Sequence, residues 1–487
     1  MPPPAKHMKR QKQTPAAKEP SKPTTAEEAV EEALALEDKG DRYASGPKAV
    51  RFYQRACEMY AHAHALDPAD LDVPYNWGRL LLILAEFSEP EFEPKEKYEL
   101  FKDAAGRLRS GDTHNADCQF NLAQALRGLA EVALEETDVG AGQREAVAAL
   151  TEAEAVLAAV YQLQKTASEM PPLKRANEAE TPEDPAESHV ATLIDTLSAH
   201  AQTLTMLFRE VAEPEASILY ERAQQKLAEA QGILDSASSE MLSADDKIQL
   251  QIDVYVRCAE VLAARADVAA QVAHRVDSET FELAVEKLSR ALDLAEGKNV
   301  EALCEKGDVL CSWSDAVKTA NGGLDKILSA EQPSAAEGEG CSSSSSSANP
   351  NPTPSPISTL RALYARAVEA YTAAYTIEQS TANIATTLGN THLLRVPLYS
   401  ASPDERLILA KNAEKYYRRA AALGDRSILM ALAKALSWSG QEAECKKVLV
   451  AWTKHGQEAE GDETAEVGFA AIVAQWVWFD AAIAGQM

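Results

Sequence analysis

Aromatic residues, paired cysteines and catalytic motifs are the features that this sequence has little of. Aromatics make up 6 % of the 487 residues, and alternating runs of Val, Thr, Ile and Tyr, which are typical of strands, are hard to find. Alanine, leucine and glutamate, which favour helices, are abundant instead. The composition therefore predicts an all-α fold.

The signature motifs of enzymes are also missing. The chain contains no G-x-S-x-G, H-E-x-x-H, G-x-x-x-x-G-K-[ST] or G-x-G-x-x-G segment, so the common nucleophile, zinc and phosphate-binding geometries are not encoded. The nine histidines are scattered, and His62 and His64, two residues apart, have no cysteine or histidine partner at metal-ligand spacing. We therefore expect a protein that is not an enzyme, with no catalytic residue, no cofactor and no metal.

Cysteine usage points to a reducing compartment. The seven cysteines are odd in number and scattered, and no two form a C-x-x-C pair, which does not fit a disulfide framework. The N-terminus lacks the apolar region of a secretory signal. We expect the protein in the cytoplasm, the nucleus or both.

The net charge of −27, from 48 basic and 75 acidic residues, is unevenly distributed. Residues 1–23 hold six basic residues and one acid, so the remaining chain carries 42 basic and 74 acidic residues, a net charge of −32. Such a body repels nucleic acid and anionic membranes and attracts basic proteins. We expect protein partners, basic ones among them, and no direct binding of nucleic acid. Solubility alone is the other explanation of the charge.

The basic N-terminal residues lie in the run KHMKRQK, which is typical of a nuclear localisation signal. A disordered tail that only aids solubility is the alternative. The basic residues concerned are Lys6, Lys9, Arg10 and Lys12.

Three stretches of low complexity interrupt the helical pattern. They are residues 1–24, rich in Pro and Lys, residues 167–188, rich in Pro and acids, and residues 321–357, which include six consecutive serines. The helical segments are then 25–166, 189–320 and 358–487. The two internal stretches are either linkers between domains or long loops within one helical stack, and the resumption of the repeat described next favours loops.

A pattern of four positions recurs along the chain: a small residue, a large apolar residue four positions later, an alanine three later and an aliphatic residue three later. These offsets predict four side chains on one helix face. The pattern occurs as Ala56, Tyr60, Ala63, Leu66; Ala146, Leu150, Ala153, Val156; Ala223, Leu227, Ala230, Ile233; Ala284, Leu288, Ala291, Leu294; Ala367, Tyr371, Ala374, Ile377; and Ala413, Tyr417, Ala420, Leu423.

This pattern resembles the second helix of the tetratricopeptide repeat, including its closing proline at Pro68. With the 34-residue period of that family, the large residue and glycine of the next first helix fall on Trp77 and Gly78, and after the Ala367 unit on Leu388 and Gly389. The spacing of successive units is irregular. The resemblance implies a divergent α-solenoid of stacked antiparallel helix pairs with a groove that binds protein segments.

Some tetratricopeptide proteins hold the C-terminal carboxylate of heat-shock chaperones with lysine, arginine and asparagine side chains. The equivalent positions here are Asp41, Ser45, Asn76, Asp117 and Asn121. Acids stand where cations are needed and would repel a carboxylate, so we expect no heat-shock carboxylate clamp.

The last helix is expected over about residues 464–484, where Trp476, Trp478 and Phe479 form a candidate partner surface. Its uncharged stretch runs only from Val467 to Phe479, whereas a membrane span needs about 20 apolar residues. The sequence therefore predicts a capping helix on the final repeat and no membrane span.

Three functions remain open: a scaffold or adaptor for protein partners, an acidic carrier or chaperone for a basic client such as a ribosomal protein or histone, and a regulator. The third follows from a segment, Ala385-Thr386-Thr387-Leu388-Gly389, that resembles the A-N-T-L-G segment of fungal enhancers of translation termination. That family implies roles in translation termination and in the hypoxic response.

Overall fold

The structure is a computed structural model and describes residues 23–43, 46–87, 92–135, 139–169, 185–238, 241–330, 354–425 and 427–460. Every regular element in these ranges is a helix, and none of the described residues lies in a strand. The predicted all-α fold is confirmed. The chain divides into two compact units, residues 1–166 and 167–487.

The first unit is built from antiparallel helices in which α1 packs on α2, α3 on α4 and α4 on α5. Its second and third helices also contact each other, so the apolar face of one pair is covered by the next. The helices are α1 (Ala26–Asp41), α2 (Pro47–Leu66), α3 (Asp72–Ala85), α4 (Pro94–Arg109), α5 (Ala116–Glu135) and α6 (Val139–Glu169).

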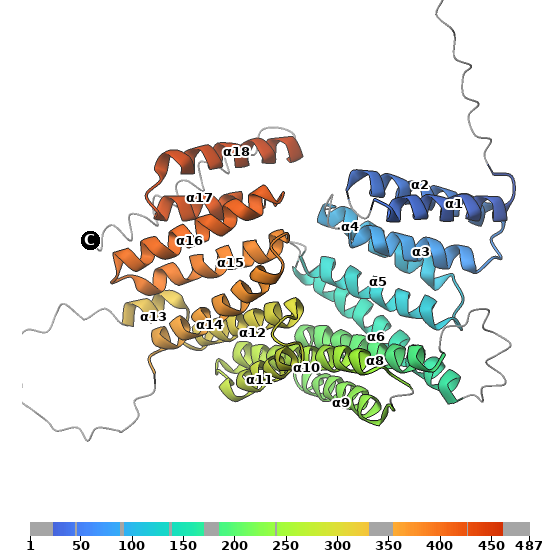
Figure 1. Ribbon diagram of the computed structural model, residues 1–487, viewed down its shortest axis with the longest axis horizontal. Coiled ribbons are helices and arrows are strands. Elements are labelled where there is room, and N and C mark those ends of the chain that lie inside the picture. The colour runs from blue at the N-terminus through green and yellow to red at the C-terminus, as the bar shows by residue number, and fades with distance from the viewer. Residues whose placement is uncertain are drawn as a thin grey trace, which may run out of the picture. The chain divides into compact units, whose positions relative to one another are not determined.

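The second unit is a longer stack of helix pairs (Figure 1). The pairs are α8 with α9, α10 with α11, α12 with α14, α15 with α16 and α17 with α18, and the second helix of each pair also contacts the first helix of the next. This connectivity is that of a tetratricopeptide-like α-solenoid. The elements are α8 (Pro185–Glu210), α9 (Glu215–Ser236), α10 (Ala244–Ala273), α11 (Ser278–Leu294), α12 (Val300–Ala320), α13 (Leu324–Ala330), α14 (Pro356–Ile377), α15 (Ala382–Arg395), the 3-10 helix η1 (Val396–Tyr399), α16 (Pro403–Ala422), α17 (Leu429–Trp438) and α18 (Glu442–Glu460).

Helices extend into both internal stretches that the sequence marks as low in complexity. α6 continues to Glu169 and α8 begins at Pro185, within the range 167–188. α13 lies within the range 321–357, where Ile327 is only 5 % exposed and packs on the core that also contains α12 and α14. The burial of this short apolar turn explains why helix persists beyond the predicted boundary.

The alanine pattern marks the core of both units. In all six occurrences the first three positions are at most 3 % exposed. The fourth position is less buried, and Leu66, Leu294 and Ile377 are 43 %, 40 % and 46 % exposed. At about 100° of rotation per residue, a residue ten positions on points about 80° away from the first, so it lies at the edge of the packed face.

Glycines in the first helices let large side chains approach the helix backbone. A Cβ added at Gly307 would lie 2.4 Å from the ring of Tyr371, and one at Gly389 would lie 2.6 Å from the ring of Tyr417. In unit 1, Gly40 meets Tyr53 in the same way. Glycine is required at these positions because any other residue would collide with the ring.

Each of these three tyrosines also bonds to the residue that follows its glycine. The hydroxyl of Tyr53 donates to Asp41 at 2.7 Å, that of Tyr371 to Asp308 at 2.6 Å, and that of Tyr417 to Asn390 at 2.7 Å. A glycine followed by a carboxylate or amide acceptor therefore recurs at contacts between helices. The glycine leaves room for the tyrosine ring, and the next residue accepts a hydrogen bond from the hydroxyl of the same tyrosine.

Candidate functional site

The residues singled out for repeat packing mostly lie inside the stack. Gly78 packs on Leu108, to which a Cβ at this glycine would come within 2.5 Å. Trp77 is half-buried and lies under the guanidinium of Arg107, 3.8 Å from the ring centre. Pro68 is exposed just beyond the end of α2. These positions serve packing and leave little surface for a partner.

Several predicted features lie outside the described residues. They are the basic run with Lys6, Lys9, Arg10 and Lys12, the aromatic cluster of Trp476, Trp478 and Phe479, and Ser45 of the clamp positions.

A row of polar side chains crosses the first helices of three successive pairs, α8, α10 and α12. On α12 the row is Glu301, Glu305, Asp308, Ser312 and Asp315, a spacing of four, three, four and three that keeps the side chains on one helix face. We call the surface made by the three rows the acidic face. Its charged residues are Asp195 and Arg209 on α8, Asp253, Arg257, Glu260 and Asp267 on α10, and Glu301, Glu305, Asp308 and Asp315 on α12.

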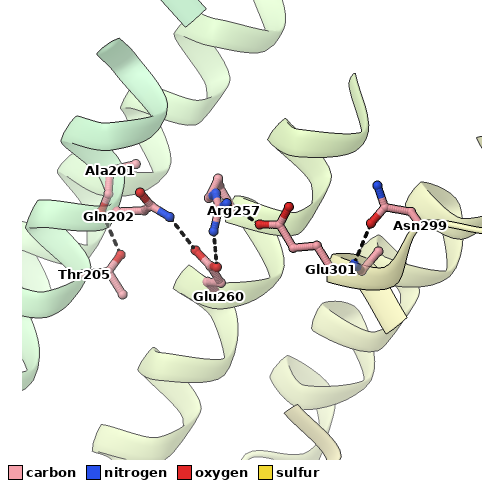
Figure 2. Close-up of polar contacts among 8 residues, drawn as sticks. Ala201, Gln202, Thr205, Arg257, Glu260, Asn299 and Glu301 are labelled. Carbon is pink, nitrogen blue, oxygen red and sulfur yellow. Dashed lines mark hydrogen bonds and ion pairs between the residues drawn. The ribbon is translucent and has the colours of Figure 1, made fainter. Parts of the chain in front are cut away.

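A chain of polar contacts joins the three helices across the acidic face (Figure 2). The amide of Gln202 donates to Glu260 at 3.4 Å. Arg257, on the same helix as Glu260, pairs with both Glu260 and Glu301. One guanidinium thus holds two carboxylates, and its geometry suits such a double contact.

The other arginine of the face is also engaged. Arg209 lies 3.9 Å from a carboxylate oxygen of Asp267, which in addition accepts a hydrogen bond from Ser312 at 2.8 Å. Two arginines therefore stand among eight carboxyl groups on this face, and both are already paired. The excess charge is negative.

Glu305 is one of four carboxyl groups of the face without an ion pair among the described residues; the others are Asp195, Asp253 and Asp308. No described residue forms a hydrogen bond or ion pair with it. Burial, together with the nearby carboxylates Glu260 and Asp308, raises the pKa of Glu305 to about 8, although Arg257 and Arg209 act in the opposite direction. A carboxyl group in this state gains strongly from a cation that arrives from outside.

Neighbouring carboxyls of the face respond in the same direction. Burial raises the pKa of Asp195, with a further contribution from Asp253 on the adjacent helix, and burial also raises the pKa of Asp253, Glu260, Asp267 and Asp308. Since burial and like charges disfavour ionisation, the face holds negative charge at a cost that a cationic ligand would relieve.

Nucleophilic and metal-binding chemistry finds no support in the described residues. Burial raises the pKa of the Cys304 and Cys311 thiols to about 11, which keeps them protonated and poorly reactive. Within the described ranges, no three His, Cys, Asp or Glu side chains are placed to hold a metal ion.

One stretch of the described chain, Gly140–Ala167 in α6, is long and apolar enough to cross a membrane by composition. Its side chains Ala146, Leu150 and Ala153 are fully buried within the protein. Core helices share this composition, so one such helix is only weak evidence for a membrane span.

The acidic face was not predicted from the sequence. The signal was present as acids at helical spacing on three successive first helices, but in a chain this acidic such spacing is common. Only the packing of α10 beside α8 and α12 brings the three rows together.

The known proteins that resemble this chain do not show what its function is. No family model matches the chain. A UPF0656 protein of Schizosaccharomyces pombe is 34 % identical over 119 residues, which cover 23 % of this chain and 26 % of that protein. The match therefore spans about a quarter of the relative's length.

Among solved structures, similar chains include a designed circular tandem repeat protein (TM-score 0.28, 13 % identity, 95 % of this chain and 96 % of that one) and a monomeric mutant of IFIT1 with Gppp-AAAA (0.32, 10 %, 94 % and 83 %). Yeast Tom70 is another (0.20, 11 %, 93 % and 98 %). Similarities with TM-scores this low do not show how this chain is arranged overall or what its function is.

Proposed function

We propose that this protein is a non-enzymatic interaction scaffold whose acidic face binds a basic segment of a partner protein. The observation that carries the proposal is a face on which eight carboxyl groups outnumber two already-paired arginines, so that four of the carboxyls, Glu305 among them, have no ion pair among the described residues. Lysine or arginine side chains would supply the missing counter-charge. A scaffold of this kind includes the acidic carrier or chaperone for a basic client.

The helix arrangement supports a binding role on physical grounds. In a stack of pairs the first helices present side chains in register from one pair to the next, which suits an extended or helical segment laid across them. The rows on α8, α10 and α12 contact each other through Gln202, Glu260 and Glu301. A partner segment would therefore meet several carboxyls at once.

The test compares three forms of the full chain in a pull-down from cell extract with quantitative mass spectrometry. The face variant carries Asp195→Asn, Asp253→Asn and Glu305→Gln. The control carries Glu279→Gln, Glu286→Gln and Asp293→Asn, which replaces the same number of carboxyl groups at exposed positions on α11. Washing at about 0.1 M and then about 0.5 M salt separates screened from unscreened contacts.

We expect basic proteins on the wild type and on the control at low salt, their loss at high salt, and their absence from the face variant. Equal capture by the face variant and the wild type would refute the acidic face as the binding surface. If the captured partners resist high salt and show no excess of basic proteins, the protein would still be a scaffold, but one that binds its partners through a surface other than the acidic face.

The regulator of translation termination remains a separate hypothesis. Its segment lies in α15, where Leu388 is fully buried and Gly389 contacts Tyr417, so helix packing accounts for these residues. Release factors or a dioxygenase among the captured proteins would support it. Location in the cytoplasm or the nucleus also stays a proposal.

A further inference from the structure

A second charged cluster, of opposite sign, lies where α15 meets α16. His392 in α15 is only 5 % exposed, and its ring stacks on Tyr416 of α16 with centres 5.7 Å apart and planes 7° from parallel. Lys415 lies with its Nζ 5.2 Å from the centre of the same tyrosine ring. Arg395 follows His392 by three residues, on the same side of the helix.

Two buried nitrogens in this cluster have no hydrogen-bond partner among the described residues: Nδ1 of His392 and Nε of Arg395. Buried polar atoms are nearly always satisfied, and each orphan costs free energy. Cations in the last turn of a helix interact well with its dipole, but this gives neither nitrogen an acceptor. Two residues that lie three positions apart on α15 therefore each carry a nitrogen whose hydrogen-bonding capacity a ligand could satisfy.

The surroundings of the cluster are basic although the chain is acidic. Burial, then Arg395, then Lys415 lower the pKa of His392 to about 4, and no carboxylate opposes them. The nearest acid along α16, Glu414, accepts hydrogen bonds from Arg418 at 2.9 Å and from Gln441 at 2.5 Å. The 3-10 helix η1, which also packs on α15 and α16, has the sequence VPLY and carries no charge.

Exposure increases from His392 through Arg395 to Lys415: the first is buried, the second half-buried and the third exposed. An anion that accepts hydrogen bonds from the two nitrogens would therefore lie on the buried side of Lys415. Nδ1 of histidine donates in one neutral tautomer and in the imidazolium form.

We propose that His392, Arg395 and Lys415 form a binding site for a single anionic group with oxygen acceptors, a carboxylate or a phosphate. The ligand oxygens accept from Nδ1 of His392 and from the Arg395 guanidinium, and Lys415 contributes charge at the entrance. This site is independent of the acidic face and would take a ligand of opposite charge.

The experiment uses the full chain with isotope-labelled histidine, followed by NMR at constant ionic strength while inorganic phosphate or acetate replaces chloride. His392→Gln identifies the resonance. We expect a saturable shift of the His392 signal and a higher His392 pKa with at least one anion, and the preferred anion distinguishes a phosphoryl from a carboxylate ligand. Loss of one charge-assisted hydrogen bond in Arg395→Gln should weaken binding about tenfold or more.

Lys415→Gln is the second variant, because its side chain is exposed and its loss should leave the fold intact. It should also weaken binding, whereas Lys411→Gln, one turn earlier and exposed on the same helix, should not. The proposal is overturned if neither anion gives a saturable shift, or if Arg395→Gln and Lys415→Gln both bind with the affinity of the wild type; water would then be the partner of the two nitrogens.

Discussion

The hydroxyl of Tyr371 donates a 2.6 Å hydrogen bond to Asp308, and its ring lies against Gly307. The bond joins α14 to α12, which are separated in sequence by residues 321–355. Removing the hydroxyl with Tyr371→Phe should cost about 1 kcal/mol and leave Asp308 without its donor. Because this donor lowers the pKa of Asp308, the substitution should raise that pKa further. Chemical denaturation and NMR titration of the carboxyl would check the two effects, and an unchanged Asp308 pKa would contradict the contact.

The glycine contacts predict opposite results at two helical glycines. Gly389→Ala places a methyl group 2.6 Å from the Tyr417 ring and should destabilise the second unit by about 1–3 kcal/mol. Gly232→Ala in α9 meets no atom within 4 Å, so it should stabilise by about 0.5–1 kcal/mol through helix propensity. Thermal unfolding of the two variants checks the contrast, and a shift of the same sign in both would refute the steric account.

A buried carboxylate in unit 1 predicts a large effect of one arginine. Glu37 is 7 % exposed and accepts hydrogen bonds from Tyr60 and Arg79. Arg79→Gln leaves a buried carboxylate without its cation and should cost about 3–5 kcal/mol. The control is Arg109→Gln: its pair with Glu152 is about 40 % exposed on both sides, so the loss should stay under about 1 kcal/mol. Denaturation curves that show equal losses would disprove the difference in burial.

Glu305 predicts a pH dependence of stability with a defined sign. Its pKa is about 8 in the folded protein against an ordinary value of 4.5, so the folded state binds more protons between these values. The stability linked to Glu305 is complete below about pH 4.5 and is lost as pH rises through about 8, with a magnitude on the order of 1–3 kcal/mol. The difference in melting temperature between wild type and Glu305→Gln should therefore grow in favour of the variant from pH 5 to pH 9. A constant difference would show that Glu305 titrates normally.

The helical repeats could be predicted because their signal is local. The alanine pattern requires only the order of residues within one helix, and its first three positions are buried in every occurrence. Leu66 is exposed because an offset of ten residues reaches the edge of the packed face, where the exposure of a side chain depends on the width of the neighbouring helix. The tyrosine contacts of the first helices also have a local sequence signal, a glycine followed by a hydrogen-bond acceptor. It occurs as Gly40-Asp41, Gly307-Asp308 and Gly389-Asn390.

The two candidate sites could not be predicted, since each depends on contacts between helices. Glu305 differs from an exposed acid because burial and the carboxylates Glu260 and Asp308 raise its pKa, while the nearby Arg257 is paired with Glu260 and Glu301. His392 differs from an ordinary core histidine only because Arg395 and Lys415 lie beside it and no carboxylate does. Both distinctions arise from packing across α10 and α12 or across α15 and α16.

The direct packing of α14 on α12 has a consequence for how the length of the chain can vary. α13 ends at Ala330 and α14 begins at Pro356, so the pair is specified by its own matched surfaces and not by the length of chain between them. In a flexible connection, doubling the length adds only about 0.6 kcal/mol of closure entropy, less than one tyrosine hydrogen bond contributes. Insertions between Ala330 and Pro356 should therefore change the free energy of unfolding by less than about 1 kcal/mol, whereas a deletion that removes α13 also removes the buried Ile327.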